Sequence, residues 1–110
     1  MVTRATRAEF ETFPGWEIIS AGLTAIAAGH QSPEACAVWI AFPRLRRVGL
    51  VDDALIDRRL AEPERALYRL LSDEGPGAYG RYNAFLRRLV SFEHALDHWM
   101  VRQPAGAIGR

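Results

Sequence analysis

The spacing of apolar residues near the C-terminal end constrains the fold of this chain more than any other feature of its sequence. Large apolar side chains recur there in alternating steps of three and four, at Tyr82, Phe85, Leu89, Phe92, Leu96 and Trp99, with Leu86, Val90 and Met100 widening the stripe. Because an α-helix has about 3.6 residues per turn, this spacing places the series on one helical face. The sequence therefore predicts a long amphipathic helix over residues 81–102, with its stripe buried in a core.

A similar spacing predicts a helix near residues 15–28. Pro14 suits the first turn of a helix, because its missing N–H has no intrahelical partner there. The apolar series Trp16, Ile19, Leu23 and Ile26 follows, and Gly29 supplies a stop. Gly22 lies inside this helix, where glycine costs about 1 kcal/mol relative to alanine. Close packing by another helix at this point would favour so small a residue.

The next segment combines a strong helix start with an apolar run. The Ser-Pro-Glu sequence at 32–34 supplies a capping hydroxyl, a proline at the first position and an acid near the positive end of the helix dipole. Residues 35–42 are apolar on every side, and periodicity alone leaves a buried strand as the alternative. The start and the alanines favour a central helix over 33–42. Pro43 is expected to interrupt it, and residues 44–49 to continue as a short basic helical turn.

The remaining segments are less strongly patterned. A frayed start and a short amphipathic turn are expected over residues 1–13, and a short helix or ordered loop over residues 51–61. Residues 64–74 predict a helix with a leucine-rich buried side. The glycines and proline of residues 72–80 predict a turn that joins antiparallel helices. The tail over residues 104–110 is expected to be disordered.

These elements predict an all-α protein, a small bundle of four to five helices with a long C-terminal amphipathic helix. A chain of 110 residues suits one core, so residues 1–103 are expected to form a single domain. The helix at 81–102 is expected to pack against the helices near 15–28 and 33–42, while the helix at 64–74 closes the bundle.

Composition argues against several functional classes. The net charge of +1 is too close to balance for an overall cationic field that would hold nucleic acid. All fourteen basic residues are arginine, a bias typical of a GC-rich bacterial genome. The longest apolar run is far shorter than the roughly twenty residues of a membrane helix, and no signal peptide is visible. A bacterial, cytoplasmic protein without membrane contact is expected.

Two residue types were considered as metal ligands. The single cysteine, Cys36, lies in an apolar run and is expected to be a small buried hydrophobe. His94 and His98 are four residues apart, so they share a helical face and could hold zinc, with Asp97 more to the side. The same face lies opposite the buried stripe, however, and surface histidines are the simpler interpretation. No metal or other cofactor is therefore expected.

Arginine and histidine also recur on the last helix. Arg87 and Arg88 precede His94 by seven and six residues. This spacing resembles the Arg-x(4–6)-His motif of the HEPN ribonucleases, small all-helical proteins that cut RNA as dimers with the motif at the dimer interface. The resemblance covers one helix, and Leu89 follows Arg88 where the family commonly has a polar residue. It implies that Arg87 or Arg88 stabilises phosphate charge while His94 takes part in proton transfer.

Two further features concern charge. Arg44, Arg46 and Arg47 form a basic cluster suited to phosphate, yet nearby acids favour surface salt bridges, and nucleic acid is not an expected partner. Those acids are Asp52, Asp53, Asp57, Glu62 and Glu64. Glu93 falls near the apolar stripe, where an unpaired carboxylate would be costly. An arginine from another helix, or a position at the edge of the core, would resolve this.

The functional hypothesis from sequence is a non-enzymatic domain that binds a protein partner or self-associates. It rests on the lack of a convincing catalytic motif and on a large supply of apolar residues for one small core. Those residues include Trp16, Trp39, Trp99, Phe85, Phe92 and Met100. The alternatives are a HEPN-like ribonuclease or metal-dependent enzyme that uses the exposed face of the last helix, and nucleic-acid binding through the arginine cluster.

Overall fold

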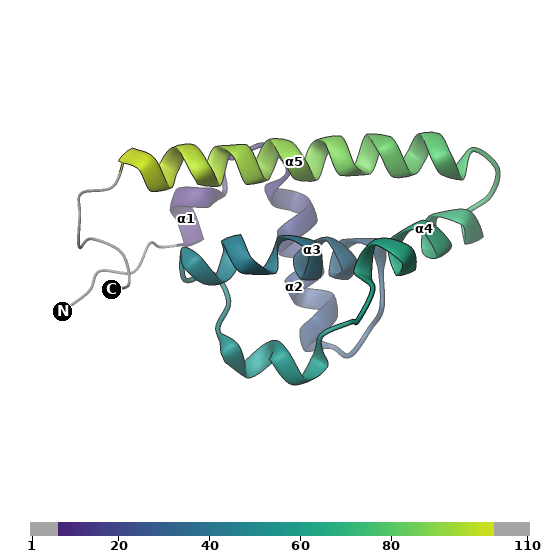
Figure 1. Ribbon diagram of the computed structural model, residues 1–110, viewed down its shortest axis with the longest axis horizontal. Coiled ribbons are helices and arrows are strands. Elements are labelled where there is room, and N and C mark those ends of the chain that lie inside the picture. The colour runs from purple at the N-terminus through teal and green to yellow at the C-terminus, as the bar shows by residue number, and fades with distance from the viewer. Residues whose placement is uncertain (1–6, 103–110) are drawn as a thin grey trace.

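A computed structural model of the protein describes residues 7–102, and all regular structure in this range is helical. The elements in chain order are α1 (Arg7–Phe10), α2 (Trp16–Ala27), α3 (Pro33–Arg47), the 3₁₀ helix η1 (Asp53–Arg58), α4 (Pro63–Asp73) and α5 (Ala78–Arg102). The all-α prediction is confirmed. Figure 1 shows α5 running the length of the molecule, with α1, α2, α3 and α4 gathered along one side of it. The predicted tail over residues 104–110 lies outside the described residues.

The stripe on α5 faces the core as predicted. Five of its members are buried, namely Phe85, Leu89, Phe92, Leu96 and Trp99, while Tyr82 is half-buried at the edge. The prediction was wrong for Val90, which remains 42% exposed. Val90 lies at the margin of the stripe, on a side of α5 that no other described helix covers. α5 also begins at Ala78, three residues before the predicted start.

The helix at the centre of the bundle is α3, which is longer than the sequence suggested. The strand alternative for residues 35–42 is excluded, because these residues are helical. The prediction that Pro43 ends the helix was wrong, since α3 continues to Arg47. Pro43 is exposed, and Leu45 and Val48 beyond it are buried. α3 therefore continues without the hydrogen bond that Pro43 cannot donate, and the burial of Leu45 and Val48 stabilises this continuation.

α2 and α3 cross closely at Gly22, as its small size suggested. A Cβ placed on Gly22 would lie 2.3 Å from the carbonyl oxygen of Glu34 and 2.6 Å from Val38 Cγ2. Only glycine lets the two backbones approach this far. Gly22 thus offsets its poor helix propensity with the most extensive helix contact in the fold.

α5 meets the beginning of α2, which starts at Trp16, one residue after the predicted start. Gly15, not Pro14, precedes the first helical residue, and it adopts a left-handed φ of 83°. A Cβ here would lie 2.7 Å from the carbonyl oxygen of Arg88 on α5. Trp16 then packs on Phe92, with ring centroids 6.2 Å apart. The expected packing of α5 against the helix near 15–28 is therefore concentrated at its first turn.

The turn between α4 and α5 is fixed by a side chain that sequence reasoning missed. The turn is shorter than the predicted 72–80, because α4 ends at Asp73 and α5 begins at Ala78. The Arg81 guanidinium donates hydrogen bonds to the carbonyls of Leu71, Gly75 and Pro76. These carbonyls lie at or beyond the C-terminal end of α4, where backbone acceptors lack helical partners. Arg81 therefore holds the two helices at a fixed angle.

The core takes up most of the large apolar side chains that motivated self-association. Trp39, Trp99, Phe85 and Phe92 are buried, while Trp16 and Met100 are partly buried against them. Phe10 of α1 is fully buried and packs edge-on against Trp99, with ring centroids 5.1 Å apart, although no role was predicted for it. The argument from an excess of these six residues therefore does not hold. None of the helices between residues 7 and 102 has the length and apolarity needed to cross a membrane.

Candidate functional site

Besides its buried stripe, α5 carries a second row of residues along one flank. Alternating steps of four and three residues place Tyr79, Asn83, Leu86, Val90, Glu93 and Asp97 in this row. Its first half is mainly apolar, and its second half is acidic. The two halves have different surroundings, and this difference defines the candidate site.

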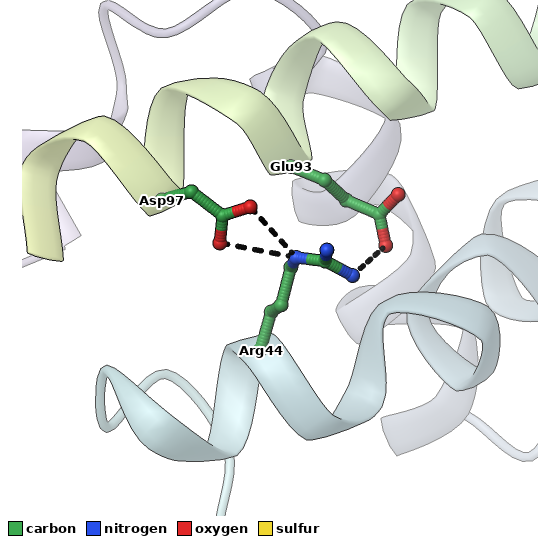
Figure 2. A network of polar contacts seen from close by, with 3 residues as sticks. All are labelled: Arg44, Glu93 and Asp97. Carbon is green, nitrogen blue, oxygen red and sulfur yellow. Dashed lines mark hydrogen bonds and ion pairs between the residues drawn. The ribbon is translucent and has the colours of Figure 1, made fainter.

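The acidic half is closed by an arginine from α3. Arg44 Nε lies 3.1 Å from Asp97 Oδ1 and 3.3 Å from Oδ2, and Arg44 Nη1 lies 3.4 Å from Glu93 Oε2. Figure 2 shows the guanidinium between the two carboxylates, with both acids projecting from the same side of α5. The predicted arginine partner for Glu93 is therefore confirmed.

Burial dominates the electrostatics of Glu93. Loss of solvent raises the pKa of the Glu93 carboxyl above its usual range, although Arg44 acts in the opposite direction. Asp97 is more exposed, and its hydrogen bond raises the pKa of Arg44. Arg44 thus compensates a carboxylate that would otherwise lie at the core edge without a partner. This cluster is a structural contact between α3 and α5.

The apolar half remains open and is joined by a residue of α4. We call Tyr68, Tyr79, Tyr82, Leu86 and Val90 the tyrosine strip, which holds all three tyrosines of the chain. Tyr68 and Tyr82 meet edge-on with ring centroids 5.3 Å apart. Tyr79 is 70% exposed and Tyr68 39% exposed. The three tyrosines line a groove between α4 and α5, and a second groove lined by Leu86 and Val90 lies further along α5.

Arginines border both grooves. Arg69 lines the tyrosine groove and Arg87 the second groove, and neither forms an ion pair with any residue in the described range. Arg65 also borders the tyrosine groove but pairs with Glu62 at 3.2 Å. One acid, Glu64, lies in the same lining. The border of the tyrosine strip is therefore mainly basic.

The histidine pair has the exposure that the helical wheel predicted. His94 and His98 are both exposed on α5. Among residues 7–102, no three His, Cys, Asp or Glu side chains are placed together in a way that could hold a metal ion. Asp97, the proposed third ligand, is held by Arg44. Cys36 is buried, and burial raises the pKa of its thiol to about 11, consistent with the predicted hydrophobic role.

The structure separates the two arginines of the HEPN-like motif. Arg88 forms an ion pair with Glu17 of α2 at 2.6 Å, and this hydrogen bond lowers the pKa of Glu17. Arg87 instead lines the same groove as His94, together with Ser91. Arg87 and His94 are therefore the only members of the motif brought to one surface in the described part of the chain.

The basic cluster on α3 is largely engaged by acids. Arg44 binds Glu93 and Asp97, and Arg46 Nε lies 2.9 Å from Asp53 Oδ1. Arg47 is exposed and forms no ion pair within residues 7–102. The pairing with nearby acids that the sequence favoured is found for Arg46, whereas Arg44 is engaged by two acids of α5 that lie far from it in the sequence.

Sequence reasoning missed the tyrosine strip because each member had a different apparent role. Tyr82 and Val90 were assigned to the core, Tyr68 to the buried side of α4, and Tyr79 to the turn. The row that joins Tyr79, Leu86 and Val90 on α5 was detectable from the alternating spacing, but its exposure depended on where α3 and α4 end. Comparison of the chain with known protein families, curated proteins and solved structures found no match.

Proposed function

We propose that this protein is a non-enzymatic interaction module that binds an apolar, acidic helix of a protein partner along the tyrosine strip. The observation that carries the proposal is the run of large side chains from Tyr79 to Val90, bordered by Arg69 and Arg87. Tyr79 and Val90 are exposed, and Tyr82 and Leu86 between them are half-buried. Tyrosine supplies a large contact area with few rotatable bonds and a hydroxyl for hydrogen bonds at the edge. Such residues are enriched at protein interfaces.

Charge supports an acidic partner in preference to a second copy. Arg69 and Arg87 lack ion pairs within the described range, so an opposing carboxylate would gain a charge-assisted hydrogen bond without breaking an internal one. Two copies joined through this strip would each bring a mainly basic border to the interface. An amphipathic helix with leucines every third or fourth residue and flanking glutamates has the complementary chemistry.

The test is a titration of the isotope-labelled protein with a synthetic helix, monitored by two-dimensional NMR. The probe is an amphipathic peptide of about 18 residues, with leucines on one face and glutamates beside them. A control peptide carries lysines in place of the glutamates. The expected result is a saturable shift of amides in α4 and the first half of α5 with the acidic peptide, and weak or no shift with the basic one.

Three outcomes would overturn the proposal. The first is the absence of saturable shifts with the acidic peptide, and the second is equal binding of the two peptides. The third is a stable dimer by analytical ultracentrifugation in which the amides of the tyrosine strip are protected, because a second copy would then occupy the site. Arg87→Glu should lower the affinity for the acidic peptide. Arg47→Glu, at a position remote in sequence from the tyrosine strip, should leave this affinity unchanged.

One observation favours a second candidate, the HEPN-like ribonuclease. Arg87 and His94 line one groove, so a cleaving pair would require only these residues and their copies in a dimer. The test is cleavage of a labelled single-stranded RNA by the purified protein. This candidate predicts activity that His94→Ala abolishes and His98→Ala retains. The interaction module predicts the same background signal for all three proteins.

A further inference from the structure

A separate pocket lies where the end of α2 and the turn after it meet α3, the end of η1 and the segment that follows η1. Its volume is about 240 Å³, and its apolar lining comes from Ile26, Ala35, Trp39 and Leu60. A dry cavity of about 150 Å³ with an aliphatic and aromatic lining is large enough to bind benzene. The pocket can therefore accept one aromatic ring with a small substituent.

The polar part of the lining is cationic. Arg58 Nη1 donates a hydrogen bond of 3.2 Å to the carbonyl oxygen of Ile26, which fixes the guanidinium beside the pocket. A guanidinium has five N–H donors, so most of them remain for another acceptor. His30 and Gln31 complete the polar lining, and no aspartate or glutamate takes part in it. This donor-rich, acid-free lining suits an anion in preference to a cation.

Trp39 adds a second donor. Its side chain is almost fully buried and forms part of the pocket lining. The indole N–H has no hydrogen-bond acceptor among the described residues, and its nitrogen keeps some contact with solvent. Buried tryptophan N–H groups usually have an acceptor. An acceptor supplied by a ligand would satisfy this group.

We propose that this pocket binds a small aromatic carboxylate. Its ring packs between Trp39 and Leu60, and its carboxylate accepts hydrogen bonds from the Arg58 guanidinium. The site is independent of the tyrosine strip, which shares none of its lining residues. Ligand binding in this pocket can therefore be tested separately from peptide binding along the tyrosine strip.

The test uses benzoate as the probe, with benzyl alcohol as a neutral compound of the same size. Each is titrated into the isotope-labelled full chain, and the indole N–H signal of Trp39 and the amides near His30 are followed by NMR. Benzoate is expected to give a saturable shift at these positions. Arg58→Gln is expected to raise the benzoate Kd at least about tenfold, because a charge-assisted hydrogen bond is lost. Arg47→Gln, a matched surface substitution, should leave the Kd unchanged.

Three results would overturn the site. One is no saturable shift near Trp39 at benzoate concentrations up to about 20 mM, where even weak fragment binding would be visible. Another is equal affinity for benzoate and benzyl alcohol, which would remove the role of the charge. The last is an unchanged benzoate Kd in a folded Arg58→Gln variant. Circular dichroism of each variant establishes that it is folded before titration.

Discussion

The two halves of the second row on α5 differ in what lies against them. In the half that contains Glu93 and Asp97, Arg44 reaches across from α3 and binds both acids (Figure 2). In the half from Tyr79 to Val90, Tyr79 and Val90 remain exposed to solvent and Leu86 is half-buried. One helix therefore combines a half that is closed by the chain itself with a half that is available to a partner.

This difference teaches that amphipathicity alone does not decide which residues of a long helix bind other molecules. α5 has 25 residues and spans about 37 Å at 1.5 Å per residue, whereas α2 meets it through its first turn, near Arg88 and Phe92. A helix that extends beyond the elements packed on it leaves part of its flank uncovered. The closed half and the buried stripe stabilise the fold, and we propose that the open half binds the partner.

The largest effect should come from the buried stripe beside the closed half. Phe92 is fully buried against Phe13 and Trp16, so Phe92→Ala should lower the free energy of unfolding by about 4 kcal/mol. Tyr79→Ala in the open half should change it by less than about 0.5 kcal/mol. Urea denaturation of both variants measures the contrast. Similar losses for the two would contradict the division of α5.

The next effect concerns Arg44 and the carboxylate it compensates. Arg44→Ala should cost about 2 kcal/mol, because it leaves Glu93 at the core edge without a partner. This figure allows for solvent screening of a half-exposed arginine. The double variant Arg44→Ala/Glu93→Gln should recover most of the loss. If the double variant were no more stable than the single one, the loss would not come from an uncompensated charge.

The pH dependence of these variants sharpens the same point. Burial raises the folded-state pKa of Glu93, so the folded protein binds this proton more tightly than the unfolded chain. The contribution of Glu93 to stability is therefore largest at low pH and declines as pH rises from its unfolded pKa through the raised folded value. Arg44 lowers the folded pKa of Glu93, so Arg44→Ala should enlarge this decline and extend it to higher pH. Glu93→Gln should abolish it, as denaturation curves at several pH values would show.

In the open half, stability should depend on Arg81 and not on the tyrosine strip. Arg81→Ala should cost about 1.5 kcal/mol, because the carbonyls of Gly75 and Pro76 lose their donor and that of Leu71 keeps only the Glu74 N–H. Arg81→Lys should cost less stability than Arg81→Ala but still some, since an ammonium lacks the planar fork that reaches several acceptors. Thermal unfolding provides the measurement. An unchanged melting temperature for Arg81→Ala would show that α4 alone holds the turn.

The smallest effect is a gain. Gly80 is helical and exposed in the open half, with no atom within 4 Å of an added Cβ, so Gly80→Ala should stabilise the protein by about 0.5 kcal/mol. The same substitution at Gly22 should destabilise it by about 2 kcal/mol, because the Cβ would clash with α3. The opposite signs, read from urea denaturation, distinguish uncovered helix from close-packed helix.

Local patterning predicted the fold well and the candidate site poorly. The period of apolar residues identified the buried stripe of α5, and the helix propensity conflict at Gly22 indicated a close crossing. Both depend on residues near each other in the chain. The continuation of α3 past Pro43 depends on packing of Leu45 and Val48, and the exposure of Val90 depends on which elements lie over α5. Those are tertiary properties that no short pattern contains.

The polar contacts were likewise predictable only in part from the sequence. Sequence placed Glu93 near the core and required a partner, but it offered no means to choose Arg44 among fourteen arginines. Arg81 was unassigned because its acceptors are backbone carbonyls of α4 and of the turn that follows it. The tyrosine strip was overlooked because its members come from two helices, and Tyr79 was expected in the turn between them.

The most direct test of the account is the affinity of the acidic amphipathic peptide for Val90→Asp. Val90 is exposed in the open half, so this change should leave the melting temperature within about 2 °C of the original protein. It should raise the Kd of the peptide by at least about tenfold, because a carboxylate would enter an apolar contact and face the peptide's glutamates. Calorimetric titration of both proteins gives the comparison. Unchanged affinity in a folded Val90→Asp protein would contradict the assignment of binding to the open half of α5.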